Sequence, residues 1–138
     1  MTILDLLAWV PTFPVALILL SFVGGERLAP IIKKAKMGSR GSTNGILIFV
    51  RKGIDYEAST IAHERQHVKD MWRMGLVGFG LWRMFDGARA RRWAETRGYA
   101  VSVKNGRPMA EAAATLAKHY GEDYNKAEAA IREAMRKV

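Results

Sequence analysis

The sequence predicts an α+β domain that is mostly α-helical, and two observations support this prediction. Only residues 46–50 form a short apolar run rich in β-branched side chains, as in a buried strand. One strand is not stable alone, so we expect a small sheet or hairpin, with residues 37–43 as the candidate partner. Four segments combine helix-forming residues with apolar periodicity or recognisable start and stop residues. These segments are 56–73, 86–104, 108–120 and 125–138.

The chain begins with an apolar stretch at residues 3–23. No charged residue lies between Leu6 and Val23, and as a helix this length of about 27 Å would just match a bilayer core. Pro11 and Pro14 disfavour a straight spanning helix, because each removes a backbone donor. We therefore expect residues 1–25 to be either a membrane anchor or an apolar arm that packs on the domain or on partner chains in an assembly.

A basic segment rich in glycine and serine follows at residues 26–43, and its composition predicts a linker. If residues 3–23 span a membrane, this positive flank keeps the remainder of the chain on the cytoplasmic side. The folded domain is then expected at residues 44–138. Within it, residues 74–85 are apolar but contain three glycines, which favours a buried connection or a flexible cleft wall over a regular helix.

The predicted helix at 56–73 contains the motif H-E-x-x-H, from His63 to His67. Histidines four residues apart lie on one face of a helix, so both imidazoles can bind one metal ion. Glu64 stands beside the first histidine, where it can take a proton from a metal-bound water. The chain has no cysteine, which leaves histidines and carboxylates as metal ligands. The competing interpretation is a chance pair of surface histidines.

A catalytic zinc usually has three protein ligands and an open position for water. Glu95 is the best third candidate, because it lies mid-helix on the next element, among residues typical of a packed position. An ordinary ion pair with Arg91 or Arg92 on the same helix is the alternative. Asp86 is better explained as a helix cap, and His119 as a residue at a helix interface.

The motif, followed 28 residues later by Glu95 within residues 93–100, resembles the gluzincin branch of zinc metallopeptidases. The resemblance covers residues 44–104 and is greatest to small forms, which include short phage- and prophage-encoded proteins. It implies a minimal zincin-like core: a short strand or small sheet, the motif helix and a glutamate-bearing helix, here followed by two C-terminal helices. The chain is much shorter than the larger members and has no obvious second lobe.

The same resemblance implies roles for individual residues. His63, His67 and Glu95 would bind Zn²⁺, and Glu64 would be the general base. A histidine or tyrosine often steadies the oxyanion in this family; Tyr99 is the first candidate here and His119 the second. The strand at residues 46–50 would lie along the cleft and pair with an extended substrate.

These features predict a zinc-dependent peptidase that hydrolyses a peptide or protein substrate. The alternative is a structural or assembly protein, such as a phage particle component, with a zinc site and little or no catalysis. Under either function, we expect the protein at the cytoplasmic side of a membrane or in a phage particle.

The net charge of +9 is compatible with nucleic acid, an anionic membrane or an acidic partner. The four arginines in 86–104 are distributed around the helix and no nucleic-acid-binding motif occurs, which disfavours nucleic acid.

Overall fold

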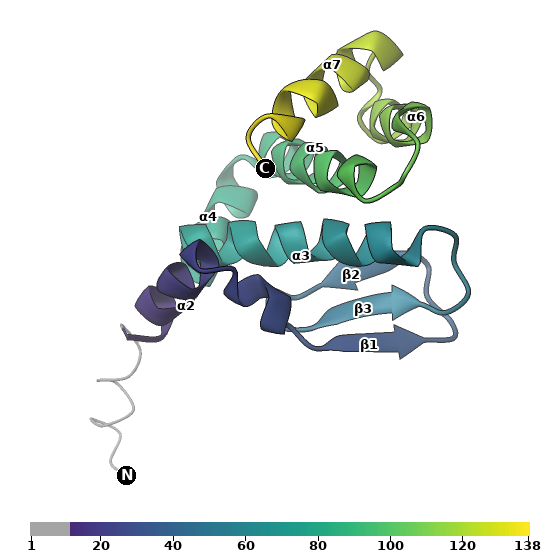
Figure 1. Cartoon of the computed structure of the whole chain (residues 1–138). Helices are drawn as coiled ribbons and strands as arrows, with labels where there is room; N and C mark the ends of the chain where they lie inside the picture. The colour runs from purple at the N-terminus through teal and green to yellow at the C-terminus, as the bar shows by residue number, and fades with distance from the viewer. Residues whose placement is uncertain (1–11) are drawn as a thin grey trace.

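The computed structural model describes residues 12–138, apart from the side chain of Leu76. It has an α+β fold that is mostly helical, with one three-stranded sheet, which confirms the predicted fold class (Figure 1). The elements are α2 (Thr12–Phe22), the 3₁₀ helix η1 (Gly25–Leu28), β1 (Ile31–Lys34), β2 (Gly41–Thr43), β3 (Ile48–Arg51), α3 (Glu57–Met74), α4 (Leu76–Phe85), α5 (Gly87–Lys104), α6 (Met109–Tyr120) and α7 (Tyr124–Met135).

The sheet has the order β1-β3-β2, with β3 parallel to β1 and antiparallel to β2. Ile48 and Val50 of β3 are fully buried and alternate with half-buried residues, as expected for a strand with one face on the core. The predicted strand at 46–50 and its partner within 37–43 are thus confirmed as β3 and β2. Because β3 is paired on both edges, it has no edge free for a substrate, and the expectation that it pairs with one is wrong.

Two strands, β1 and β2, lie inside the stretch 26–43 that composition predicts as a linker. Both are edge strands, so each needs only one backbone partner and can leave most of its side chains in solvent. Lys33 and Lys34 of β1 are exposed in this way. Their charge is typical of an edge strand, which explains why the stretch has no apolar signature.

Residues 1–11 of the predicted apolar arm lie outside the described part of the chain. From Thr12 onward the arm forms α2, which packs against α3 and buries Leu17 in a cluster with Val68 and Trp72 of α3. Among residues 12–138, no helix is both long and apolar enough to cross a membrane.

Residues 76–85 form the regular helix α4, so the expectation of an irregular connection is wrong. Gly78 and Gly80 face open space, and their lack of side chains leaves the packing unaffected. The helix is held instead by aromatic contacts: Phe79 is buried, and Trp82 packs edge-to-face against Phe79 and against Trp93 of α5. Tertiary packing therefore outweighs the low helix propensity of glycine here.

The buried apolar residues of the described range 12–138 form two core clusters. One joins α2, β3 and α3, and the other joins α5, α6 and α7, which confirms that the two predicted C-terminal helices pack as part of the domain. Helix α3 lies between the sheet and α5 (Figure 1). Its residues facing α5 are mostly polar although buried, and buried polar groups need specific partners. The candidate site lies along this polar seam.

Candidate metal centre

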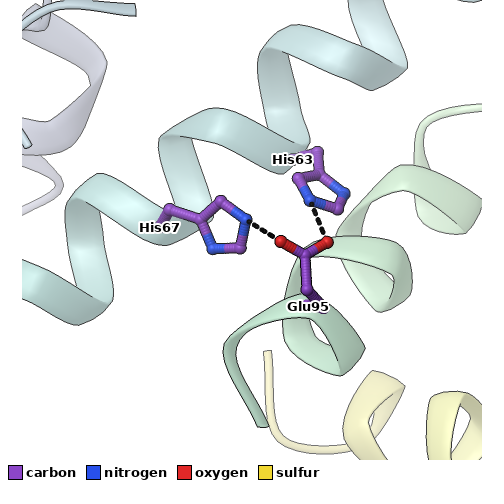
Figure 2. A group of neighbouring side chains, drawn as sticks. All are labelled: His63, His67 and Glu95. Atoms are coloured by element: carbon purple, nitrogen blue, oxygen red, sulfur yellow. Dashed lines mark ion pairs between the residues drawn. The ribbon is translucent and has the colours of Figure 1, made fainter. Parts of the chain in front are cut away.

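His63 and His67 of α3 converge with Glu95 of α5 (Figure 2). His63 Nε2 lies 3.3 Å from Glu95 Oε2, and His67 Nε2 lies 3.4 Å from Glu95 Oε1. The two imidazoles meet edge-to-face with centroids 4.6 Å apart. One donor atom from each of the three residues can be chosen so that all lie within 4.8 Å of one another. Glu95 reaches between the rings and presents one oxygen to each.

Glu95 pairs with the histidines and not with the arginines of its own helix. Arg92 is instead bound by Glu122, at 2.9 Å from Nη2 to Oε2. Arg91 makes no ion pair with any residue in the described range. The alternative, an ion pair of Glu95 with Arg91 or Arg92 on its own helix, is therefore wrong. Asp86 immediately precedes α5, as expected for a cap, but accepts no side-chain capping hydrogen bond.

Burial and mutual charge set the protonation of this cluster. Burial lowers the pKa of His63, and only part of this effect is offset by Glu95. Burial would also lower the pKa of His67, but the hydrogen bond and charge of Glu95 outweigh it and raise the value. Burial would raise the pKa of Glu95, yet the two histidines hold it well below its usual range. These shifts keep Glu95 anionic and favour neutral His63, the forms that a metal ligand needs, whereas the raised pKa of His67 means that this imidazole must lose a proton to bind a metal ion.

Glu64 lies beside the cluster and is itself buried. Its burial raises the pKa of the carboxyl to about 7. Gly41 of β2 packs directly over it: a Cβ built on Gly41 would lie 2.9 Å from Glu64 Oε1 and 2.8 Å from Thr60 Cγ2. Only glycine at this position lets the sheet edge approach the Glu64 carboxylate so closely.

A second glycine fixes the approach of α5 to α3. A Cβ built on Gly98 would lie 2.6 Å from His63 Nε2 and 2.7 Å from His63 Cε1. Glycine in mid-helix is unfavourable for helix stability, but here it makes room for an imidazole whose ligand atom faces the other helix. Neither close approach can be recognised from the sequence, because each depends on which helix face meets which neighbour.

Polar contacts tie α3 to α5 on both sides of the site. Ser59 and Ser102 each donate a hydroxyl hydrogen bond to the other's carbonyl oxygen, both at 3.1 Å. Toward the other end of α3, Arg97 Nε donates to both carboxylate oxygens of Asp70, at 3.1 and 3.0 Å. The Asp70 side chain is only 1% exposed and that of Arg97 13%. His67 and Glu95 are held between these two fixed points.

Tyr99 packs against the ligand cluster as its position one turn beyond Glu95 predicts. Its ring meets His63 edge-to-face at 4.8 Å, and its burial raises the pKa of the phenol to about 12. His119, the second candidate, lines the same cavity as His63. Its neighbour Tyr120, which the sequence did not predict as a site residue, lines this cavity too, and the Tyr120 hydroxyl is buried with no hydrogen-bond partner among residues 12–138. An unpaired hydroxyl leaves no signal in a sequence.

Two neighbouring cavities flank the cluster and share the lining residues Gly41, Glu64, Arg91 and Glu95. The cavity on the His67 side, of about 300 Å³, is bounded by the three residues of β2 and by apolar residues such as Phe79. The cavity on the His63 side, of about 560 Å³, is bounded by α5, α6 and the residues just before β2. Together they form a cleft with the candidate site in its wall.

The donor set itself fits zinc. Two imidazole nitrogens and one carboxylate are a ligand combination found in catalytic zinc sites. In metal sites the second ring nitrogen of a histidine ligand usually donates a hydrogen bond. Here His67 Nδ1 is buried without a hydrogen-bond partner in the described part of the chain.

Comparison of the chain with protein-family models, with curated proteins and with solved structures gives no match in any of the three.

Proposed function

We propose that the protein is a zinc-dependent peptidase of the gluzincin type, with a zincin-like core formed by the sheet, α3 and α5. The observation that carries this proposal is the convergence of His63, His67 and Glu95 from two helices, with their donor atoms within 4.8 Å. A buried carboxylate, Glu64, and an open cleft lie beside them. A chance pair of surface histidines would have neither the third ligand nor the cleft.

Zinc in this site would supply a Lewis acid that lowers the pKa of a coordinated water toward neutrality. Glu64 lines both cavities and is adjacent in sequence to His63. In the proposed mechanism it accepts the proton of the attacking water and delivers it to the leaving amine. Tyr99 and Tyr120 are the two candidates for a hydrogen bond to the oxyanion. Replacing the one that donates by phenylalanine should lower kcat by roughly 100-fold or more.

The edge strand β2 is the proposed substrate-binding strand. Arg40 O accepts a hydrogen bond from Arg51 N at 2.9 Å, so by antiparallel alternation Ser42 also faces β3. The backbone groups of Gly41 and Thr43 then point to the free edge, where the Gly41 carbonyl accepts a hydrogen bond from the Ser39 hydroxyl at 2.8 Å, and both residues line the cleft. An extended peptide can add there as a further strand, which would bring the carbonyl carbon of the bond to be cleaved close to Glu64.

Hydrolysis of a peptide library, with and without a chelator, tests this function. We expect chelator-sensitive cleavage, and we expect Glu64→Gln to keep zinc while losing hydrolysis. His63→Ala should lose zinc. Glu122→Gln is a matched control, because Glu122 pairs with Arg92 and lines neither cavity. Full activity of Glu64→Gln on a cleaved peptide would contradict the role of the base. Absence of cleavage by the zinc-loaded protein would favour the structural alternative.

A second role is favoured by the exposed apolar side chains of α2. Phe13, Leu19 and Phe22 are all more than half exposed. Arg73 of α3 lies over the Phe22 ring, 5.4 Å from its centroid, and Arg27 is exposed just beyond the helix. Apolar side chains bordered by cations are typical of a helix that lies on an anionic membrane. We propose such a surface as the partner of α2, while docking onto a protein assembly is the alternative outcome.

A further inference from the structure

The cavity on the His63 side is lined by arginines that the proposed hydrolysis does not use. Three arginines line it: Arg40 before β2, Arg91 on α5 and Arg107 before α6. They come from three separate parts of the chain and meet only in the folded protein. The cavity also contains His63 and Glu95, so whatever occupies it lies next to the candidate metal centre.

Three carboxylates, those of Glu64, Glu95 and Glu111, line the cavity with the three arginines, but none of them pairs with Arg91. Arg40 and Arg107 share a single carboxylate oxygen, Glu111 Oε1, at 3.3 and 3.0 Å. The third guanidinium, that of Arg91, forms no ion pair with a described residue. Glu95 is engaged by the two histidines. Arg91 is therefore an arginine without an ion-pair partner among the described residues, and it lines the cavity together with Glu95 of the candidate site.

Arg107 also has an unused donor. Its Nη2 donates to Glu111 and to the Thr115 hydroxyl, at 3.0 and 3.2 Å, and the guanidinium lies over the Tyr99 ring, 5.0 Å from its centroid. Its Nε is buried and has no partner in the described part of the chain. A buried, unpaired donor of a charged group is unfavourable, and a carboxylate is the acceptor that a guanidinium binds best.

We infer that this cavity binds a carboxylate of the substrate. The inference rests on the proposed peptidase function only in taking the ligand to be a peptide. Two parts of a peptide carry this group: an aspartate or glutamate side chain, and the free C-terminus. Arg91, which has no ion-pair partner among the described residues, is the first candidate to bind it, and the unpaired Nε of Arg107 is the second.

Binding of four fluorescent peptides to the full-length protein tests the inference. The peptides share one sequence and differ in having glutamate or glutamine at one position and a free or amidated C-terminus. Fluorescence anisotropy is measured with a chelator present, which prevents cleavage. We expect the peptide that loses the recognised carboxylate to bind about tenfold more weakly, as for one charged hydrogen bond. The pair that shows the loss identifies the side chain or the C-terminus as the ligand.

Matched variants separate a specific site from general attraction to a basic protein. Arg91→Gln should abolish the difference between acid and amide peptides. Arg89→Gln, an exposed arginine on the same helix that lines neither cavity, should preserve it. Equal binding of all four peptides overturns the inference, as does an equal effect of the two variants. Acid-selective binding in this test, together with no cleavage by the zinc-loaded protein in the peptide-library assay, would leave the inference standing and remove the peptidase function. Cleavage without a preference for the acid peptides would overturn the inference and leave the peptidase function standing.

Discussion

The Gly98→Ala substitution tests directly whether α5 must approach His63 closely for the site to form. The new methyl group would lie 2.6 Å from His63 Nε2, whereas ordinary van der Waals contact begins at 3.4 Å. The imidazole must therefore retreat or α5 must move outward. Zinc–ligand distances tolerate deviations of only about 0.2 Å, so either response displaces the ligand atom beyond what the ion accepts.

We expect Gly98→Ala to weaken zinc binding by roughly 10- to 100-fold, the range found when groups that orient metal ligands are removed. The fold should survive, because overpacking costs about 1–3 kcal/mol and alanine recovers part of this through its higher helix propensity. Zinc affinity is measured by competition with a chromogenic chelator. Thermal unfolding of the metal-free protein, followed by circular dichroism, reports the stability separately.

Gly87→Ala is the matched control for this experiment. It makes the same chemical change in the same helix, but no atom lies within 4 Å of the added methyl group. Its zinc affinity should equal that of the wild type. If Gly98→Ala binds zinc as tightly as Gly87→Ala, then His63 is not held against α5 as a ligand, and the assignment of the site is refuted.

Three further predictions concern the proposed base Glu64, the polar contact between α3 and α5, and the exposed apolar side chains of α2. Gly41→Ala would crowd the Glu64 carboxylate, so hydrolysis should fall on the order of 100-fold with zinc affinity unchanged; parallel losses of both would contradict this. Asp70→Ala breaks the buried ion pair between α3 and α5 and should lower the free energy of unfolding in urea by about 3–5 kcal/mol. Glu133→Gln, which removes an exposed ion pair with Lys137, should leave the free energy of unfolding unchanged. Phe22→Ser should weaken flotation with anionic vesicles about tenfold; unaltered flotation would exclude α2 from the contact.

The elements that the sequence predicts well are those whose pattern is local. The helices at 56–73, 86–104 and 108–120 carry their own periodicity and stop residues, and the structure places them within a few residues of those limits. Helix α4 differs from the expectation because Trp82 packs against Trp93 of α5, a contact between two helices that the sequence of residues 74–85 does not show. Edge strand β1 was missed because lysines replace the apolar alternation on which strand prediction depends.

The candidate ligands could be chosen from the sequence because each has a local reason. The spacing of His63 and His67 places them on one helix face, and Glu95 stood out as an acid in an apolar context. Their convergence could not be derived, since it depends on how α5 crosses α3. For the same reason, the cavity that unites Arg40, Arg91 and Arg107 has no signature in the chain order.

Zinc content of the purified protein after dialysis, measured by atomic emission for the wild type and for Glu95→Ala, tests the central claim most directly. We predict about one zinc per wild-type chain, in keeping with a site of three protein ligands, and a large loss in Glu95→Ala. Glu122→Ala should retain the ion, because Glu122 lies in a separate ion pair with Arg92. A wild-type protein without zinc, or a Glu95→Ala variant that keeps it fully, would contradict the metal centre proposed for α3 and α5.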